Sequence, residues 1–190
     1  ICPLSIMDSA WRDDLFTFAT HRTVSVAHGS ADKRKKIIQE GAEYVVINYD
    51  GVGIVLKELQ EGGFDLIIVD EATHYKNAQT TRWKNLKWLM KDDTWLWMMT
   101  GTPAAQNPTD AYGLAKLVTP TGVPRFFGAF KDKVMFKVSQ FTWKIKPTAT
   151  ETVFNALQPA IRFTKDECLD LPPMVYLKRQ IELTTQQKKY

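Results

Sequence analysis

The strongest indication of the fold is the stretch Phe64-Asp65-Leu66-Ile67-Ile68-Val69-Asp70-Glu71-Ala72-Thr73. Its apolar residues, 66–69, run without alternation into two adjacent carboxylates, Asp70 and Glu71. Such a run is typical of a strand that is buried on both faces of a parallel sheet with helices on each side. Open α/β sheets place their ligand sites at the carboxyl ends of strands, where these carboxylates fall. Taken alone, the stretch equally allows a core strand that ends in a solvated acidic turn.

The two carboxylates favour a particular chemistry. Adjacent negative charges are costly to bury unless a positive group compensates them. A magnesium ion that carries nucleotide phosphates is the usual compensation. In that arrangement the first carboxylate, Asp70, holds the metal through water, and Glu71 polarises the attacking water.

A second apolar stretch extends the same architecture. Trp95-Leu96-Trp97-Met98-Met99 runs into the turn Thr100-Gly101-Thr102-Pro103, and residues 79–91 between the two stretches have an amphipathic helical pattern. Strand, helix and strand, with polar groups at both strand ends, predict one crossover of a parallel sheet.

These motifs together resemble the first motor lobe of the SNF2 branch of the superfamily 2 nucleic-acid-dependent ATPases. Several weak motifs occur in the family order along nearly the whole chain. They are Asp70-Glu71-Ala72-Thr73 (motif II, the DEAD/DEAH-like box), Lys76-Asn77 after it, Thr100-Gly101-Thr102-Pro103 (motif III), Gln106-Asn107, Leu171-Pro172-Pro173, and the ending 183–190.

The resemblance implies a RecA-like parallel sheet flanked by helices, with a helical insertion after motif III. It also implies ATP and Mg²⁺ as cofactors, and nucleic acid, double-stranded DNA in the first place, and a second RecA-like lobe as partners. Its implied site residues fall into four groups: Asp70 (also the magnesium ligand) and Glu71 for catalysis, Thr100, Gly101 and Thr102 for coupling, Thr73, Lys76 and Asn77 with the box, and Pro3, Leu4, Ser5, Asn48 and Tyr49 for nucleic acid.

Two of the nucleic-acid residues have a simpler interpretation. Ser5 follows Ile1-Cys2-Pro3-Leu4, a strand end that resembles motif Ia, and it also suits a helix N-cap. Asn48 ends the apolar stretch 44–47, which resembles motif Ib, and an Asx turn into the following helix explains it equally well.

The box departs from the commoner family pattern. Its fourth position, often His, is Thr73, and His74 falls one place later, so His74 is not given the family histidine's coupling role. A hydrogen bond from Thr73 toward motif III is the expected substitute. This departure looks like compact bacterial and phage-type members. We therefore expect an intracellular protein, in the cytoplasm or at the nucleoid of a bacterial or phage-infected host cell.

The segment 124–146 mixes aromatic residues with lysines. Interleaved aromatic and basic side chains can form a stacking surface for single strands. A small helical subdomain with its aromatics packed inward and its lysines in water is the preferred interpretation, because the family places a helical insertion here.

We expect three regions: 1–103 as the RecA-like core, 104–159 as the insertion, and 160–190 as a connector toward a second lobe. The chain contains no Gly-Lys pair, hence no phosphate-binding Gly-x-x-x-x-Gly-Lys loop. We therefore expect this chain to be part of a larger motor and to be inactive by itself. The alternative is a non-catalytic nucleic-acid or protein-binding scaffold derived from an ATPase lobe.

The composition argues against some classes of protein but does not indicate a function. A net charge of +4 is compatible with nucleic acid without indicating it. Cys2, Cys168 and the three histidines have no metal-ligand spacing, and no apolar run approaches the length of a membrane span. The sequence thus favours neither a zinc site, nor a disulfide framework, nor a membrane protein.

Overall fold

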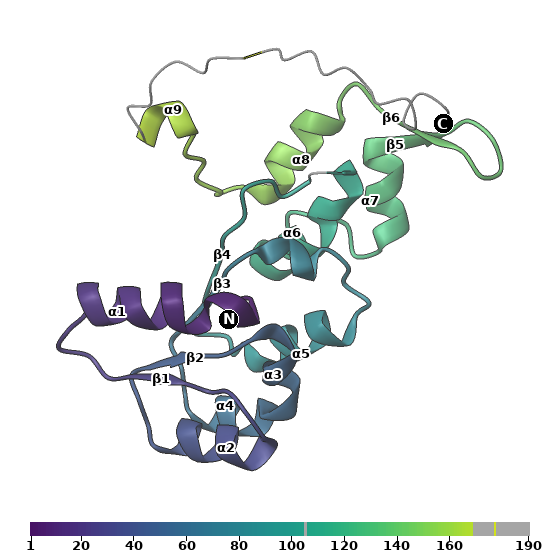
Figure 1. The fold of residues 1–190 in the computed structure, drawn as a ribbon. Helices are drawn as coiled ribbons and strands as arrows, with labels where there is room; N and C mark the ends of the chain where they lie inside the picture. The colour runs from purple at the N-terminus through teal and green to yellow at the C-terminus, as the bar shows by residue number, and fades with distance from the viewer. Residues whose placement is uncertain (105, 169–176, 178–190) are drawn as a thin grey trace, which may run out of the picture. The chain divides into compact units, whose positions relative to one another are not determined.

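Figure 1 shows the computed structural model, which describes residues 1–104, 106–168 and 177. Contacts divide the chain into a compact unit, Ile1–Pro159, and a second unit, Ala160–Tyr190. The described part of the second unit contains one short helix, α9 (Lys165–Cys168). The Leu-Pro-Pro segment at 171–173 and the ending 183–190 lie outside the described residues.

The first unit is built on parallel strands, as predicted. Two parallel pairs form, β1 with β2 and β3 with β4. Ile1 and Cys2 lie between the pairs, since the Cys2 amide donates to the Ile47 carbonyl (3.1 Å) and the Asp70 amide donates to the Ile1 carbonyl (2.9 Å). The resulting order is β1, β2, residues 1–2, β3, β4. The strands are β1 (Val24–Val26), β2 (Tyr44–Val46), β3 (Leu66–Val69) and β4 (Trp95–Met98).

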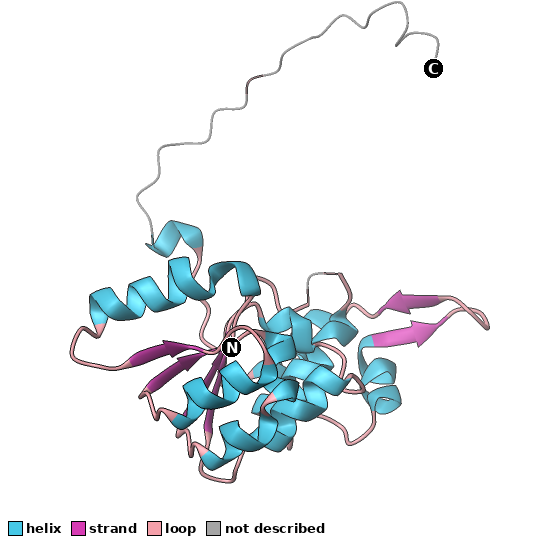
Figure 2. Ribbon diagram, turned by 60° about the horizontal axis from the view of Figure 1, so that its bottom comes forward, coloured by secondary structure: helices cyan, strands magenta, loops and turns pink. Residues whose placement is uncertain are grey.

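Helices cover both faces of β1 and β2 and one face of β3 and β4 (Figure 2). A buried core that includes Ile38, Val52, Leu59, Val69 and Leu86 joins one face to four helices. A smaller core around Cys2, Met7 and Val46 joins the other face of β1 and β2 to the N-terminal helical segment. The helices are α2 (Ala31–Gln39), α3 (Tyr49–Ile54), α4 (Leu56–Glu61) and α5 (Thr81–Leu89) on the first face, and η2 (Met7–Arg12) and α1 (Asp13–Phe18) on the second.

The prediction that β3 is buried on both faces is wrong. Ile67 and Val69 are buried, whereas Leu66 is 37% exposed. On the paired strand, Trp95 and Trp97 are also largely exposed. Side chains alternate along a strand, and paired residues of parallel neighbours share a face. Leu66, Trp95 and Trp97 therefore lie on one face of β3 and β4, and this face is largely exposed.

The segment after motif III forms a subdomain with its own core, in which Tyr112, Ala115, Phe130 and Val134 are buried. It contains an antiparallel hairpin, β5 with β6, that the sequence analysis did not predict. The elements are η4 (Pro108–Asp110), α6 (Ala111–Val118), α7 (Phe127–Val134), β5 (Met135–Lys137), β6 (Trp143–Ile145) and α8 (Ala149–Leu157).

Inward packing of the aromatics holds for only part of this segment. Phe130 is buried, and Trp143 is half-buried with the Lys131 ammonium 3.8 Å from its ring centroid. The aromatics that remain exposed are Phe126, Phe127, Phe136 and Phe141. The hairpin explains part of this, because its strands turn alternate side chains such as Phe136 away from α7.

Among the residues that the structure describes, no helix has the length and apolar character needed to cross a membrane.

Candidate functional site

Asp70 follows β3 and is held at each of its polar groups. Its carboxylate Oδ1 accepts from the Glu71 amide (2.8 Å), and Oδ2 accepts from the indole Nε1 of Trp11 (3.1 Å). Its carbonyl accepts from the hydroxyl of Tyr49 (2.8 Å), and its amide donates to Ile1. Two hydrogen bonds thus orient the carboxylate, while Tyr49 and Ile1 hold the backbone of Asp70.

Glu71 has a left-handed backbone, with φ 45° and ψ 53°, and is exposed. A non-glycine residue there is strained by about 1–3 kcal/mol, and such strain persists where the surroundings hold it. The next residue, Ala72, begins the short helix η3 (Ala72–Tyr75), and its amide donates to the Met99 carbonyl (2.8 Å). The turn at Glu71 therefore joins the end of β3 to the end of β4.

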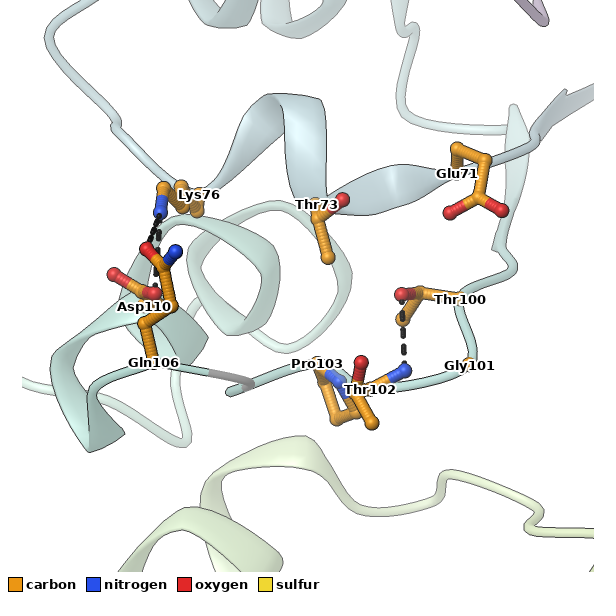
Figure 3. A pocket seen from close by; sticks show the side chains of 9 residues that line it. All are labelled: Glu71, Thr73, Lys76, Thr100, Gly101, Thr102, Pro103, Gln106 and Asp110. Carbon is orange, nitrogen blue, oxygen red and sulfur yellow. Dashed lines mark hydrogen bonds and ion pairs between the residues drawn. The ribbon is translucent and has the colours of Figure 1, made fainter. Parts of the chain in front are cut away.

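The neighbouring strand ends bring motif II and motif III around one cavity of about 390 Å³ (Figure 3). The parallel register places Val69 opposite Met98, so the residues that follow the two strands emerge side by side. Glu71 borders this cavity opposite Thr100, whereas Asp70 does not line it. The lining residues are Glu71, Thr73, Lys76, Thr100, Gly101, Thr102, Pro103, Gln106 and Asp110.

Lys76 connects the box to the segment after motif III. Its ammonium lies 3.2 Å from the Asp110 carboxylate and 3.5 Å from the Gln106 side-chain oxygen. Sequence reasoning missed Asp110, which no motif spacing marks. The connection is possible because α6 approaches η3 closely at Gly113, where an added Cβ would meet the carbonyl of Lys76.

The other box-associated residues differ in their surroundings. Thr73 lines the cavity, but its hydroxyl makes no hydrogen bond to motif III within the part of the chain that the structure describes. Asn77 lies outside the cavity lining and accepts from the Gln79 amide (2.9 Å), a turn that leads into α5. Within motif III the Thr100 hydroxyl accepts from the Thr102 amide (3.3 Å).

The five residues expected at nucleic acid come from two adjacent segments. A parallel bridge joins Cys2 to Asn48, which places Pro3-Leu4-Ser5 beside Asn48-Tyr49. Leu4 and Ser5 are exposed, Pro3 and Asn48 are half-buried, and Tyr49 is buried. Ser5 lies inside the short helix η1 (Leu4–Ile6) and is not an N-cap. Burial first, and the nearby Asp70 carboxylate second, raise the pKa of the Tyr49 hydroxyl.

A cationic and aromatic cluster surrounds Tyr49, and sequence reasoning missed it. The Arg82 guanidinium lies 5.1 Å from the Tyr49 ring centroid and pairs with Asp50 at 2.6 Å. The His74 ring lies 4.6 Å from the ring of Tyr49, and its Nδ1 is 3.3 Å from Arg82. His74 thus packs against Tyr49 and does not line the cavity. No sequence pattern links these positions, which only the packing of α3 against α5 brings together.

Comparisons with known proteins agree with this geometry. The sequence model of the SNF2-related domain matches residues 1–190. A Drosophila melanogaster protein, the SWI/SNF-related matrix-associated actin-dependent regulator of chromatin subfamily A containing DEAD/H box 1 homolog, is 26% identical over 100% of this chain and 24% of its own length. The ATP-dependent helicase fft2 of Schizosaccharomyces pombe is 25% identical over 95% of this chain and 14% of its own.

A solved structure is similar as well. The Sulfolobus solfataricus SWI2/SNF2 ATPase core in complex with dsDNA has a TM-score of 0.56 and 30% identity, covering 70% of this chain and 26% of that one. The chain thus spans about a quarter or less of these proteins' lengths. The family match covers every residue, and the parallel α/β fold agrees with it. This chain belongs to the SNF2-related domain family.

Proposed function

We propose that this chain is the first RecA-like part of an ATP-dependent, nucleic-acid-stimulated motor that couples ATP hydrolysis to movement along DNA or to its remodelling. The observation that carries the proposal is the cavity where Glu71, Thr73 and Lys76 meet Thr100, Gly101 and Thr102 at the ends of two parallel strands. Relatives named ATP-dependent helicases, and a solved SWI2/SNF2 ATPase core, support it.

The donor set around Asp70 fits magnesium bound through water. Each Asp70 carboxylate oxygen accepts one described hydrogen bond, which leaves lone pairs for metal-bound water. No group of three or more His, Cys, Asp or Glu side chains gathers as a metal site among the described residues. Magnesium keeps several waters and binds through one or two carboxylates plus substrate phosphates, so one oriented carboxylate suffices. When bound, it would neutralise phosphate charge.

Within this proposal Glu71 is the base that orients water, because its exposed carboxylate faces the cavity beside Thr100 (Figure 3). Thr100, Gly101 and Thr102 would carry the nucleotide state onward, since they follow β4 and border the same cavity. Thr73 and Lys76 would shape the wall, while Asn77 would hold the turn that follows the box.

Pro3, Leu4, Ser5 and Asn48 would contact the DNA backbone, with Tyr49 behind them. The hydrogen bond from Tyr49 to the carbonyl of Asp70 gives a direct connection between the two sites. Double-stranded DNA is the proposed partner because the similar solved ATPase core is a complex with dsDNA. The proposed motor also has a second RecA-like lobe. It is of the compact bacterial or phage type and acts at the nucleoid.

The test uses the protein encoded by the complete reading frame that contains this chain. Glu71→Gln should lower DNA-stimulated ATP hydrolysis by about 100-fold or more, because a general base contributes that much, and should leave ATP binding intact. Glu40→Gln, which changes an exposed glutamate at the end of α2, should have no effect. Full activity of Glu71→Gln would show that Glu71 is not the base. Absence of ATP hydrolysis in the unmodified protein, together with DNA binding that is indifferent to ATP and magnesium, would instead support a non-catalytic scaffold.

A further inference from the structure

Arg34 is buried, 6% exposed, and has no carboxylate partner among the described residues. Its guanidinium donates to carbonyl-type oxygens instead. Nε donates to the Gly29 carbonyl (2.9 Å), and Nη1 donates to the Ala27 carbonyl (2.6 Å) and to the Asn48 Oδ1 (2.9 Å). A buried charge is costly without compensation, so this one calls for an explanation.

The contact determines which way the Asn48 amide faces. A guanidinium only donates hydrogen bonds, so the oxygen of the amide must face Arg34, and its NH₂ group must turn away. Asn48 occupies the N-cap position of α3, yet its side chain makes no capping hydrogen bond. The Asx turn that would explain this residue without nucleic acid is therefore absent at Asn48. Within the described residues, no acceptor takes a hydrogen bond from the NH₂ group.

Gly51 makes room for this arrangement. A Cβ at this position would meet Arg34 Nη1, and it would lie 2.7 Å from Asn48 Oδ1. Three residues from α2, the end of β2 and α3 are thus fitted to one another beside the exposed Leu4 and Ser5.

We infer that Arg34 is a positioning residue that holds Asn48 with its NH₂ group presented to a phosphate of the nucleic-acid backbone. The inference rests on the proposed function and names a residue that acts through Asn48. Arg34 contributes in two ways: it fixes the amide rotamer, and it places an uncompensated positive charge behind the donor. The fixed rotamer keeps the donor in place for an acceptor, and the positive charge favours an anionic acceptor over a neutral one.

The first experiment measures the affinity of the protein encoded by the complete reading frame for a fluorescent DNA duplex by anisotropy. Asn48→Ala should weaken binding by about 10-fold, the effect of one hydrogen bond to a charged group. Arg34→Lys should weaken it similarly, because a single ammonium cannot reach all three acceptors. The double variant should bind no more weakly than either single variant, since Arg34 acts through Asn48.

Gly51→Ala disturbs the contact between Arg34 and Asn48 in a different way and should therefore also weaken DNA binding. Gly53→Ala, two residues along the same helix, is its control. A Cβ at Gly53 meets only the Asn85 side chain, so DNA affinity should stay unchanged. Thermal melting of each variant separates loss of the fold from loss of binding. Unchanged affinity of folded Arg34→Lys beside a weakened Asn48→Ala would overturn the inference, as would losses that multiply in the double variant.

A second readout does not depend on DNA. The NMR chemical shifts of the two Asn48 side-chain amide protons should change and move closer to each other in Arg34→Lys. They should stay as they are in Gly53→Ala. If the unmodified complete protein does not bind the duplex, the proposed function fails, and these resonances alone decide whether Arg34 positions Asn48. Identical Asn48 resonances in Arg34→Lys and the unmodified chain would overturn the positioning role.

Discussion

The indole nitrogen of Trp11 donates a hydrogen bond to the carboxylate of Asp70 at 3.1 Å, between residues 59 apart in the chain. Trp11 has the helical spacing of a core residue, and its ring does pack against the small core around Cys2 and Met7. Its polar end has a second role. It holds one oxygen of the carboxylate while the Glu71 amide holds the other. A tryptophan of the N-terminal helical segment thereby orients the proposed magnesium ligand.

Trp11→Phe keeps an aromatic ring and removes the donor. We expect the magnesium concentration for half-maximal ATP hydrolysis by the complete protein to rise several-fold, because the Asp70 carboxylate loses one of its two orienting hydrogen bonds. DNA affinity without nucleotide should not change. Trp88→Phe, at an exposed position of α5, is the control. An unchanged magnesium dependence would show that the indole contact does not orient Asp70.

The left-handed backbone at Glu71 predicts an unusual order of stability. The free energy of unfolding of Glu71→Gly should exceed that of Glu71→Ala by about 1–2 kcal/mol, because only glycine adopts this conformation without strain. At Glu40, where φ is −64°, the order should reverse. Chemical denaturation of the four variants measures both differences. Equal stabilities at position 71 would mean that the turn relaxes.

Gly113→Ala should destabilise the first unit. An added Cβ would meet the Lys76 carbonyl, which belongs to the backbone and cannot rotate away. We expect a loss of about 1–3 kcal/mol, typical of overpacking, and weakened contact between Lys76 and Asp110. Gly128→Ala lies in α7 with open space around it, and should be neutral or stabilising. A fully stable Gly113→Ala protein would contradict the close approach of α6 and η3.

Tyr75 is fully buried, and its hydroxyl has no hydrogen-bond partner among the described residues. Burial raises its pKa. Tyr75→Phe should therefore be as stable as the unmodified chain or more stable by about 1 kcal/mol, because an unsatisfied buried group is removed. Tyr112→Phe is the matched control and should lose about 1 kcal/mol, since its hydroxyl donates to the Arg125 carbonyl at 2.8 Å. Destabilisation by Tyr75→Phe would reveal a partner for that hydroxyl.

Glu43 predicts a pH dependence at the edge of the sheet. Its ion pair with Arg22 first, and the Thr23 amide second, lower the pKa of the Glu43 carboxyl. A lowered folded-state pKa means that the carboxylate stabilises the fold above its unfolded pKa of about 4.3 and loses this effect as pH falls through the folded value. Glu43→Gln should thus be less stable than the unmodified chain at pH 7, and the difference in stability should shrink as pH falls below about 4. A difference that does not depend on pH would contradict this.

Several features were readable from the sequence because neighbouring residues encode them. The apolar run 66–69 and the stretch 95–98 form paired parallel strands, as their lengths and the intervening helical pattern predict. The polar residues after each strand end up around one cavity because parallel strands share their carboxyl edge. The hairpin at 135–145 escaped prediction, since its three-residue strands are too short to show a period.

The parallel α/β fold and, through the ordered motifs, the family can be predicted from the amino-acid sequence, because strand length, helical periodicity and turn chemistry are local properties. Which distant side chains meet follows from the packing of the folded chain. Trp11 on Asp70, Asp110 on Lys76 and Arg34 on Asn48 join residues that no spacing relates. The same packing also determines that Glu71 adopts a left-handed backbone. Such contacts depend on how elements pack, and packing follows the shape of the whole core, not a local pattern.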